Sequence, residues 1–151
     1  MRRGAPRTNP DADGCGLLWC SPVVPNTGND LASVTRLASD TLLTFGFEPQ
    51  MAISLATERT AICVITISYD RAEPGADARA LDCYRALTQL LIVAGYPPYR
   101  LNVNSSTAFE GHPEYAETLR ALKTALDPNG ILAPGRYVRQ SPPRAEQEGV
   151  A

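Results

Sequence analysis

The sequence predicts an α+β fold, with an antiparallel or mixed sheet that carries helices on one face. Three observations support this prediction. Residues 61–69 alternate in apolar character with the two-residue period of a strand. Residues 31–45 and 76–94 each carry apolar side chains at steps of three and four, as an amphipathic helix does. The expected order is strand, helix, strand, strand, helix, strand, helix, which is typical of the α+β class.

The first strand is expected within Gly16–Val24, a short apolar run in which Pro22 marks an edge or a bulge. Asn29 or Asp30 is predicted to cap the helix that follows, and Gly46 is predicted to end it. The apolar stripe of this helix consists of Leu31, Val34, Ala38, Leu42 and Phe45.

A hairpin is expected next. Met51, Ile53 and Leu55 alternate with smaller residues, and the segment 57–60 suits a turn. The returning strand, 61–69, is rich in β-branched residues, which favour strands. One of its faces should consist of Cys63, Ile65, Ile67 and Tyr69.

The second half of the chain predicts two helices and a short strand. A helix is expected over 76–94 with Gly95 as its stop, followed by a strand over Tyr99–Val103. Pro113 suits the first turn of a last helix, which should end at Asp127-Pro128-Asn129-Gly130. The stripes of the two helices are Leu81, Tyr84, Leu87 and Leu91, and Tyr115, Leu119, Leu122 and Leu126.

Composition excludes several functional classes. The chain has 151 residues, is 44% hydrophobic and has a formal net charge of −2, which argues against nucleic-acid binding. No apolar run is long enough for a membrane span, and no secretory signal follows the basic N-terminus. Four cysteines and a single histidine match no zinc pattern, so reduced thiols in a cytoplasmic protein and no metal site are predicted.

Residues taken one by one do not form a complete active site. His112 is expected to be a surface residue, and no nucleophile elbow or phosphate-cradling glycine motif is present. The adjacent Tyr99 and Arg100 are suggestive, since together they offer a phenol and a guanidinium. A tyrosine packed at a strand edge beside a solvated arginine is the alternative.

Four segments in order resemble the vanillyl-alcohol oxidase and 4-cresol dehydrogenase family of flavin-dependent oxidoreductases. They are Gly16–Pro22, Ser68–Arg71, Tyr96–Arg100 and Asp127–Tyr137. The resemblance implies the C-terminal part of such an enzyme, with a ferredoxin-like cap or substrate domain. It divides the chain into a disordered lead-in (1–13), a cap portion (14–112), a return toward the FAD domain (113–137) and a disordered tail (138–151).

The resemblance also implies site residues. Tyr99 and Arg100 would be catalytic and face the flavin and the phenolic oxygen, with Tyr99 and Trp19 binding substrate. Arg100 and Arg136 would approach the cofactor. The alternatives are a core tryptophan at position 19 and a surface arginine at position 136. FAD would be held non-covalently, because no histidine or tyrosine lies between Met1 and Val24.

The function implied is oxidation of a small para-substituted phenol by hydride transfer to flavin. The pyrophosphate-binding half is absent from the sequence, so the chain alone should be inactive and need a polypeptide that supplies the FAD domain. The alternative is a non-catalytic remnant that folds as a small self-associating α+β module. A homodimer is expected only by analogy to the family. Neither nucleic acid nor a membrane is an expected partner.

Overall fold

The computed structural model describes residues 13–100 and 113–135, and the chain divides into two compact units, 1–100 and 101–151. Each unit is considered by itself. The elements of the first unit are β1 (Cys15–Cys20), β2 (Val23–Pro25), α1 (Gly28–Thr44), β3 (Gln50–Leu55), β4 (Thr60–Asp70) and α2 (Ala76–Val93). The second unit contains α3 (Pro113–Leu126).

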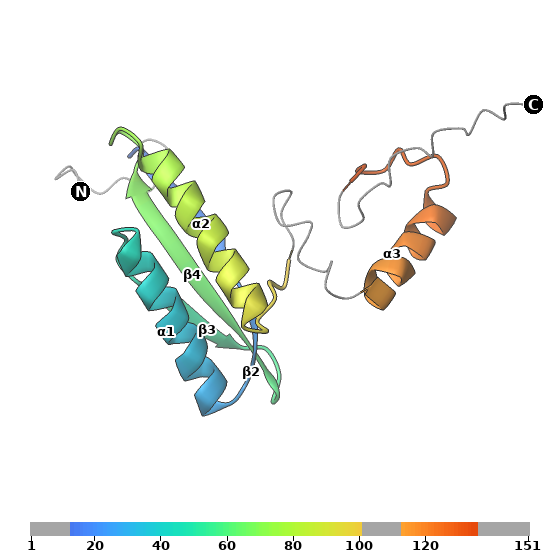
Figure 1. The fold of residues 1–151 in the computed structure, drawn as a ribbon, viewed down its shortest axis with the longest axis horizontal. Helices are drawn as coiled ribbons and strands as arrows, with labels where there is room; N and C mark the ends of the chain where they lie inside the picture. The colour runs from blue at the N-terminus through green and yellow to red at the C-terminus, as the bar shows by residue number, and fades with distance from the viewer. Residues whose placement is uncertain (1–12, 101–112, 136–151) are drawn as a thin grey trace, which may run out of the picture. The chain divides into compact units, whose positions relative to one another are not determined.

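The long strand β4 is the centre of an antiparallel sheet (Figure 1). β1 and β2 follow one another along one edge of β4, and β3 pairs with its other edge. The pairs Cys20–Ile65 and Val23–Ile62 show that β1 and β2 share one register. Pro22 interrupts them because it has no N–H to donate, although its carbonyl accepts the Cys63 N–H at 3.1 Å.

After α2, where a last strand was predicted, the structure has an isolated bridge between Pro22 and Pro98. If β1 and β2 are counted as one strand and the bridge as the last strand, the chain order is strand, helix, strand, strand, helix, strand. The bridge lies on the side of β1 and β2 that faces away from β4. The predicted ferredoxin-like fold is therefore confirmed. The predicted strand at Tyr99 and Arg100 is wrong, since both lie in a bend. Residues 101–103 of that prediction lie outside the described residues.

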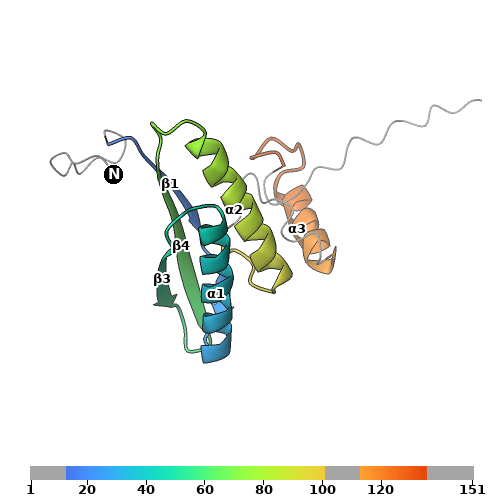
Figure 2. The same cartoon turned by 60° about the vertical axis from the view of Figure 1, so that its left-hand side comes forward.

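Helices α1 and α2 lie together on one face of the sheet (Figures 1 and 2). Thr27, rather than the predicted Asn29 or Asp30, caps α1, because its side-chain oxygen accepts the Asp30 N–H at 3.2 Å. Gly46 and Gly95 follow the helix ends at φ 77° and 87°. There the next residue's N–H bonds back five positions, to Leu42 and Leu91, which satisfies helix carbonyls that would otherwise be unpaired.

The core lies between the helices and the sheet. Cys63, Ile65 and Ile67 of β4 have no exposed surface, which confirms the predicted inner face of that strand. The facing residues come from β1, β2, α1 and α2: Cys20, Val24, Val34, Ala38, Leu42, Ala80, Cys83, Leu87 and Leu91. Burying these apolar side chains is the main favourable contribution to folding.

The opposite face of the sheet carries no helix of the unit formed by residues 13–100 (Figures 1 and 2). Strand alternation directs Leu18 and Cys20 to the helices and Leu17 and Trp19 away from them. Trp19 is accordingly 65% exposed and Leu17 is 42% exposed. The tryptophan is thus a surface residue, and the alternative of a core tryptophan is wrong.

The second unit has little core among its described residues. α3 begins at Pro113 as predicted, but none of its residues is buried. Its apolar stripe therefore lies on the surface, with Leu122 and Leu126 54% and 79% exposed. No helix within the described ranges has the length and hydrophobicity that crossing a bilayer requires.

We expect Gly16→Ala to destabilise the first unit by about 1–3 kcal/mol, the usual cost of overpacking. Gly16 pairs with Tyr69 across β1 and β4, and a Cβ at Gly16 would lie 2.2 Å from the tyrosine ring. Urea unfolding measures the change. Gly28→Ala is the matched control, because a Cβ there meets no atom within 4 Å. Equal losses in the two variants would contradict the proposed clash.

Three thiols should resist labelling in the folded protein. Cys20, Cys63 and Cys83 are buried and free, whereas Cys15 is partly exposed. Burial raises the pKa of Cys20 and of Cys83 from 9.0 to about 11. A thiol reagent at about pH 8 should therefore modify Cys15 first and the other three only on unfolding. Fast reaction of all four thiols in the native protein would contradict this burial.

The same thiols predict an alkaline loss of stability. Their folded pKa values lie above the unfolded value, so the unfolded chain releases these protons first. The free energy of unfolding should therefore fall as the pH rises from 9.0 toward about 11. Replacing Cys83 with Ala should reduce this slope in urea titrations at several pH values.

Candidate functional site

The backbone of Tyr99 is bonded to the chain just after β1, the strand that carries Trp19. The Tyr99 N–H donates to the carbonyl of Ser21 at 3.1 Å, two residues beyond Trp19. Tyr99 is 51% exposed and Trp19 is 65% exposed. Both aromatic side chains, one of which has a hydroxyl, are therefore accessible on the surface of this unit.

Arg100 lies against Tyr99. The guanidinium carbon of Arg100 is 5.4 Å from the centre of the Tyr99 ring, within the range of a cation–π contact. The segment that leads to the pair is stiff, because Pro97 and Pro98 fix their own φ angles. It is also paired with β2, since the Val23 N–H donates to the Pro97 carbonyl at 2.8 Å.

A buried tyrosine anchors the start of this segment. Tyr96 is 8% exposed, and its hydroxyl donates to a carboxylate oxygen of Asp30 in the first turn of α1 at 3.1 Å. The other oxygen of Asp30 accepts the Thr27 hydroxyl at 2.6 Å. Burial, then the adjacent Asp30, raises the pKa of Tyr96, so the phenol stays protonated and able to donate.

The sequence alone did not reveal this contact. Tyr96 and Asp30 are 66 residues apart, and neither occupies a position that a local pattern marks as paired. The one available signal was the place of Tyr96 directly after Gly95, where a side chain usually packs back against the helix that has just ended.

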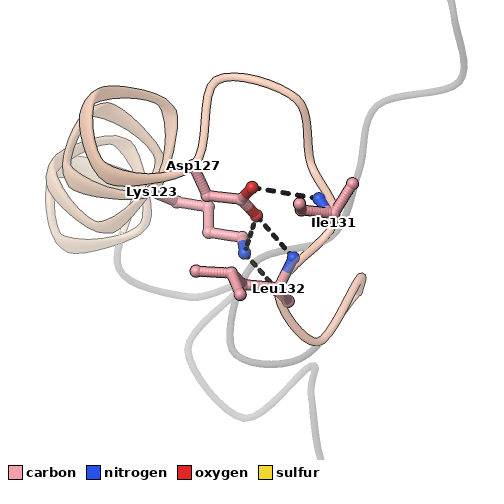
Figure 3. Close-up of polar contacts among 4 residues, drawn as sticks. All are labelled: Lys123, Asp127, Ile131 and Leu132. Carbon is pink, nitrogen blue, oxygen red and sulfur yellow. Dashed lines mark hydrogen bonds and ion pairs between the residues drawn. The ribbon is translucent and has the colours of Figure 1, made fainter.

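Arg136, the remaining predicted site residue, lies outside the described residues. The turn before it is well defined and is organised by Asp127 (Figure 3). The Asp127 carboxylate accepts the Ile131 N–H at 3.0 Å and the Leu132 N–H at 2.9 Å. Lys123, one helical turn earlier, donates to the same carboxylate and to the Leu132 carbonyl.

This Asp127 clamp fixes the course of the chain after α3. Asp127 is 6% exposed, and the Lys123 hydrogen bond, followed by those from the backbone, lowers its pKa despite burial. The sequence predicts Asp127 only as part of a helix stop, and its bonds to the backbone were not predicted. An aspartate before Pro-Asn-Gly is the signal that could have indicated them, since aspartate side chains commonly bond to the backbone of turns.

Asp127→Asn should loosen the turn at Ile131 and Leu132. The carboxylate's stabilising effect is present above the ordinary aspartate pKa of 3.8 and is lost as the pH falls through the lowered folded value. The amide signals of Ile131 and Leu132 in NMR spectra should thus titrate with a midpoint below 3.8 in the original protein. In the variant this titration should disappear.

Glu117→Gln is the control for the Asp127 experiment, because it removes an exposed carboxylate from α3. Its effect on the two amide signals should be small. The clamp would be contradicted if those amide signals titrated at the ordinary aspartate pKa of 3.8. It would also be contradicted if their titration persisted in Asp127→Asn.

The described site residues offer hydrogen bonding, cationic charge and aromatic surface. Arg100 can stabilise an anion, Tyr99 can donate a hydrogen bond, and Trp19 offers an apolar surface to a planar ring. Among the residues that the structure describes, no group of three or more His, Cys, Asp or Glu could hold a metal ion. The arrangement suits recognition of an aromatic molecule that carries negative charge.

Comparison with known proteins gives two related sequences. The chain is 43% identical over 140 residues to 1'-carboxy-chondrochloren decarboxylase of Chondromyces crocatus, covering 90% of this chain and 26% of that protein. It is 32% identical over 125 residues to the 4-cresol dehydrogenase [hydroxylating] flavoprotein subunit of Pseudomonas putida, covering 82% of this chain and 24% of the relative. No protein-family model matches the chain.

Solved structures agree with the sequence relatives. p-Cresol methylhydroxylase with substrate bound superposes with a TM-score of 0.72 and 30% identity, covering 82% of this chain and 24% of that one. 4-Ethylphenol oxidase from Gulosibacter chungangensis, in its isoeugenol complex, shares the fold with a TM-score of 0.73 and 24% identity over 83% of this chain and 25% of that one. The chain is therefore a homologue, in sequence and in fold, of one segment of 4-cresol dehydrogenase, and it spans about a quarter of the length of the relatives it matches.

Proposed function

We propose that this chain is the C-terminal, cap-forming segment of an FAD-dependent oxidoreductase that oxidises para-substituted phenols. The observation that carries the proposal is the exposed Tyr99–Arg100 pair, which backbone bonding to Ser21 holds beside the end of β1. The relatives support it, because one is a flavoprotein named for 4-cresol and another for 4-ethylphenol.

The chemistry follows from the charge of the substrate. A 4-alkylphenol loses a benzylic hydride more readily as a phenolate, because the oxygen's electrons move toward a quinone methide. The positive charge of the Arg100 guanidinium stabilises that phenolate. Tyr99 donates a hydrogen bond to the same oxygen, and Trp19 provides an apolar wall for the ring. A flavin, when bound, supplies the hydride acceptor.

The residues fit a flavin in part. The sheet face opposite the helices is open within residues 13–100, and Trp19 on it is 65% exposed, as a wall against a flat ring system would be before that ring binds. Arg100, and Arg136 beyond the Asp127 clamp, would meet the cofactor's negative charge. The sequence offers no glycine-rich cradle for the pyrophosphate. We therefore propose that FAD is held mainly by further polypeptide, and that it is non-covalent because no histidine or tyrosine lies between Met1 and Val24.

That further polypeptide, whether a separate chain or a continuation of this one, is the partner we propose. The curated relatives are about four times as long as the matched segment. α3 has 14 residues, a length that is marginal for a helix standing alone in water. Its Leu126 and the following Ile131 are 79% and 73% exposed. An FAD domain that covers these side chains would supply the missing core. Self-association through them is the competing arrangement.

Decarboxylation is a second candidate reaction. The relative with 43% identity is named as a decarboxylase of a carboxylated compound. The guanidinium of Arg100 can pair with a carboxylate as well as with a phenolate. Release of carbon dioxide from a para-hydroxyarylacetic acid, compared with flavin reduction by 4-cresol, separates the two reactions.

Arg100→Ala should slow flavin reduction by 4-cresol about a hundredfold or more, the usual size of losing one charge-stabilising group. The chain is first combined with its FAD domain, and retained flavin is verified from the visible absorption band. Stopped-flow absorbance then follows flavin reduction under anaerobic conditions.

Arg59→Ala is the matched control, since it removes an exposed arginine in the turn between β3 and β4. It should leave the rate within about twofold, as expected of a surface change. Near-normal reduction in Arg100→Ala would contradict the role of Arg100. A protein that binds FAD but is reduced by no phenol would contradict the proposed substrate class.

A further inference from the structure

We propose that Tyr96 and Asp30 position the Tyr99–Arg100 pair by tying its segment to the first turn of α1. Neither residue is assigned a role in the proposed reaction, and neither is expected to touch substrate or flavin. The positioning inference concerns the fold of residues 13–100, and its catalytic consequence rests on the proposed function.

The anchor begins where the chain leaves α2. Gly95, at φ 87°, turns the backbone, and the Tyr96 N–H bonds to the Leu91 carbonyl at 2.8 Å. This turn directs the Tyr96 side chain into the protein, where it is 8% exposed. Its hydroxyl meets Asp30 at 3.1 Å. The end of α2 is thereby joined to the beginning of α1.

Asp30 is itself held in place. One carboxylate oxygen accepts from Tyr96 and the other accepts the Thr27 hydroxyl at 2.6 Å. The Asp30 N–H returns a bond to the Thr27 oxygen at 3.2 Å. Thr27 caps the helix and lies two residues after β2, and its N–H donates to the Pro25 carbonyl at 2.8 Å. The carboxylate therefore has a fixed place relative to the sheet edge.

A short segment connects this anchor to the exposed pair. From Tyr96 the chain passes through two prolines and is bonded to the sheet at the Pro97 carbonyl and the Tyr99 N–H. Only these two prolines separate the buried phenol from the exposed one. The isolated bridge at Pro98 is too short to fix the direction of a strand by itself. The Tyr96–Asp30 contact supplies the additional restraint.

The test compares Tyr96→Phe with Tyr69→Phe. Both variants keep the aromatic ring and remove one phenol hydroxyl. Tyr96 donates to Asp30, whereas the pKa of Tyr69 is raised by burial and then by Asp77, away from the Tyr99–Arg100 segment in sequence. Hydrogen exchange by NMR on the whole chain measures the Tyr99 and Val23 amides, the two that bond between the segment and the sheet. Tyr96→Phe should speed their exchange about fivefold, as loss of one hydrogen bond allows, and Tyr69→Phe should not.

A catalytic readout separates positioning from general loss of stability. In the flavin-loaded protein, Tyr96→Phe should lower the limiting rate of flavin reduction by 4-cresol about tenfold, with a much smaller change in KM. A displaced charge weakens stabilisation of the transition state more than binding of the apolar ring. Asp30→Asn serves as the second variant and should act in the same direction.

The outcomes distinguish the two proposals. Unchanged exchange at Tyr99 and Val23 in both Tyr96→Phe and Asp30→Asn overturns the positioning role, whatever the enzyme does. Faster exchange with a slower limiting rate supports it. Faster exchange with unchanged flavin reduction supports the structural anchor but overturns the assignment of Tyr99 and Arg100 to the phenol.

Discussion

The pairing of β4 with three other strands is the interaction on which the rest of the first unit depends. β1, β2 and β3 all pair with it, and the bridge at Pro98 joins the sheet through the β1–β2 edge. Because side chains alternate along a strand, a slip of one residue would turn the buried Ile65 and Ile67 to the open face. Register and core therefore enforce one another, and the helices pack on the face that this register makes apolar.

That register also determines, indirectly, where Tyr99 and Arg100 lie. Their segment bonds to Ser21 and Val23, and these residues stand where they do because β1 and β2 share one alignment on β4. The chain pairs with the sheet at Pro98 only as a single bridge, and it bends at Tyr99 and Arg100. The loss of regular strand structure thus leaves both side chains accessible.

Local patterns predicted most of the fold and little of how the site is held. The alternation at 61–69 and the glycines after the helices were sufficient, because each acts within a few residues. The predicted cap of α1 was wrong because Thr27, Asn29 and Asp30 are all residue types that cap helices well. The path of the chain after β2 determines which of them is used. Leu17 and Trp19 are as apolar as Leu18 and Cys20, so the sequence could not say which face the helices cover. The Tyr96–Asp30 contact spans 66 residues and has no local signature.

The exposed apolar surfaces and the exposed pair have one physical explanation under the proposed function. Trp19 and Leu126 stay in water because the segment, about a quarter as long as its relatives, has nothing to cover them among its described residues. The same water weakens the field of Arg100, since a charge acts far more strongly in a covered, low-dielectric site. This chain's fold can fix where the guanidinium stands, but its catalytic strength requires a surface that excludes solvent. Under the proposed function, a partner would therefore be required for electrostatic as well as structural reasons.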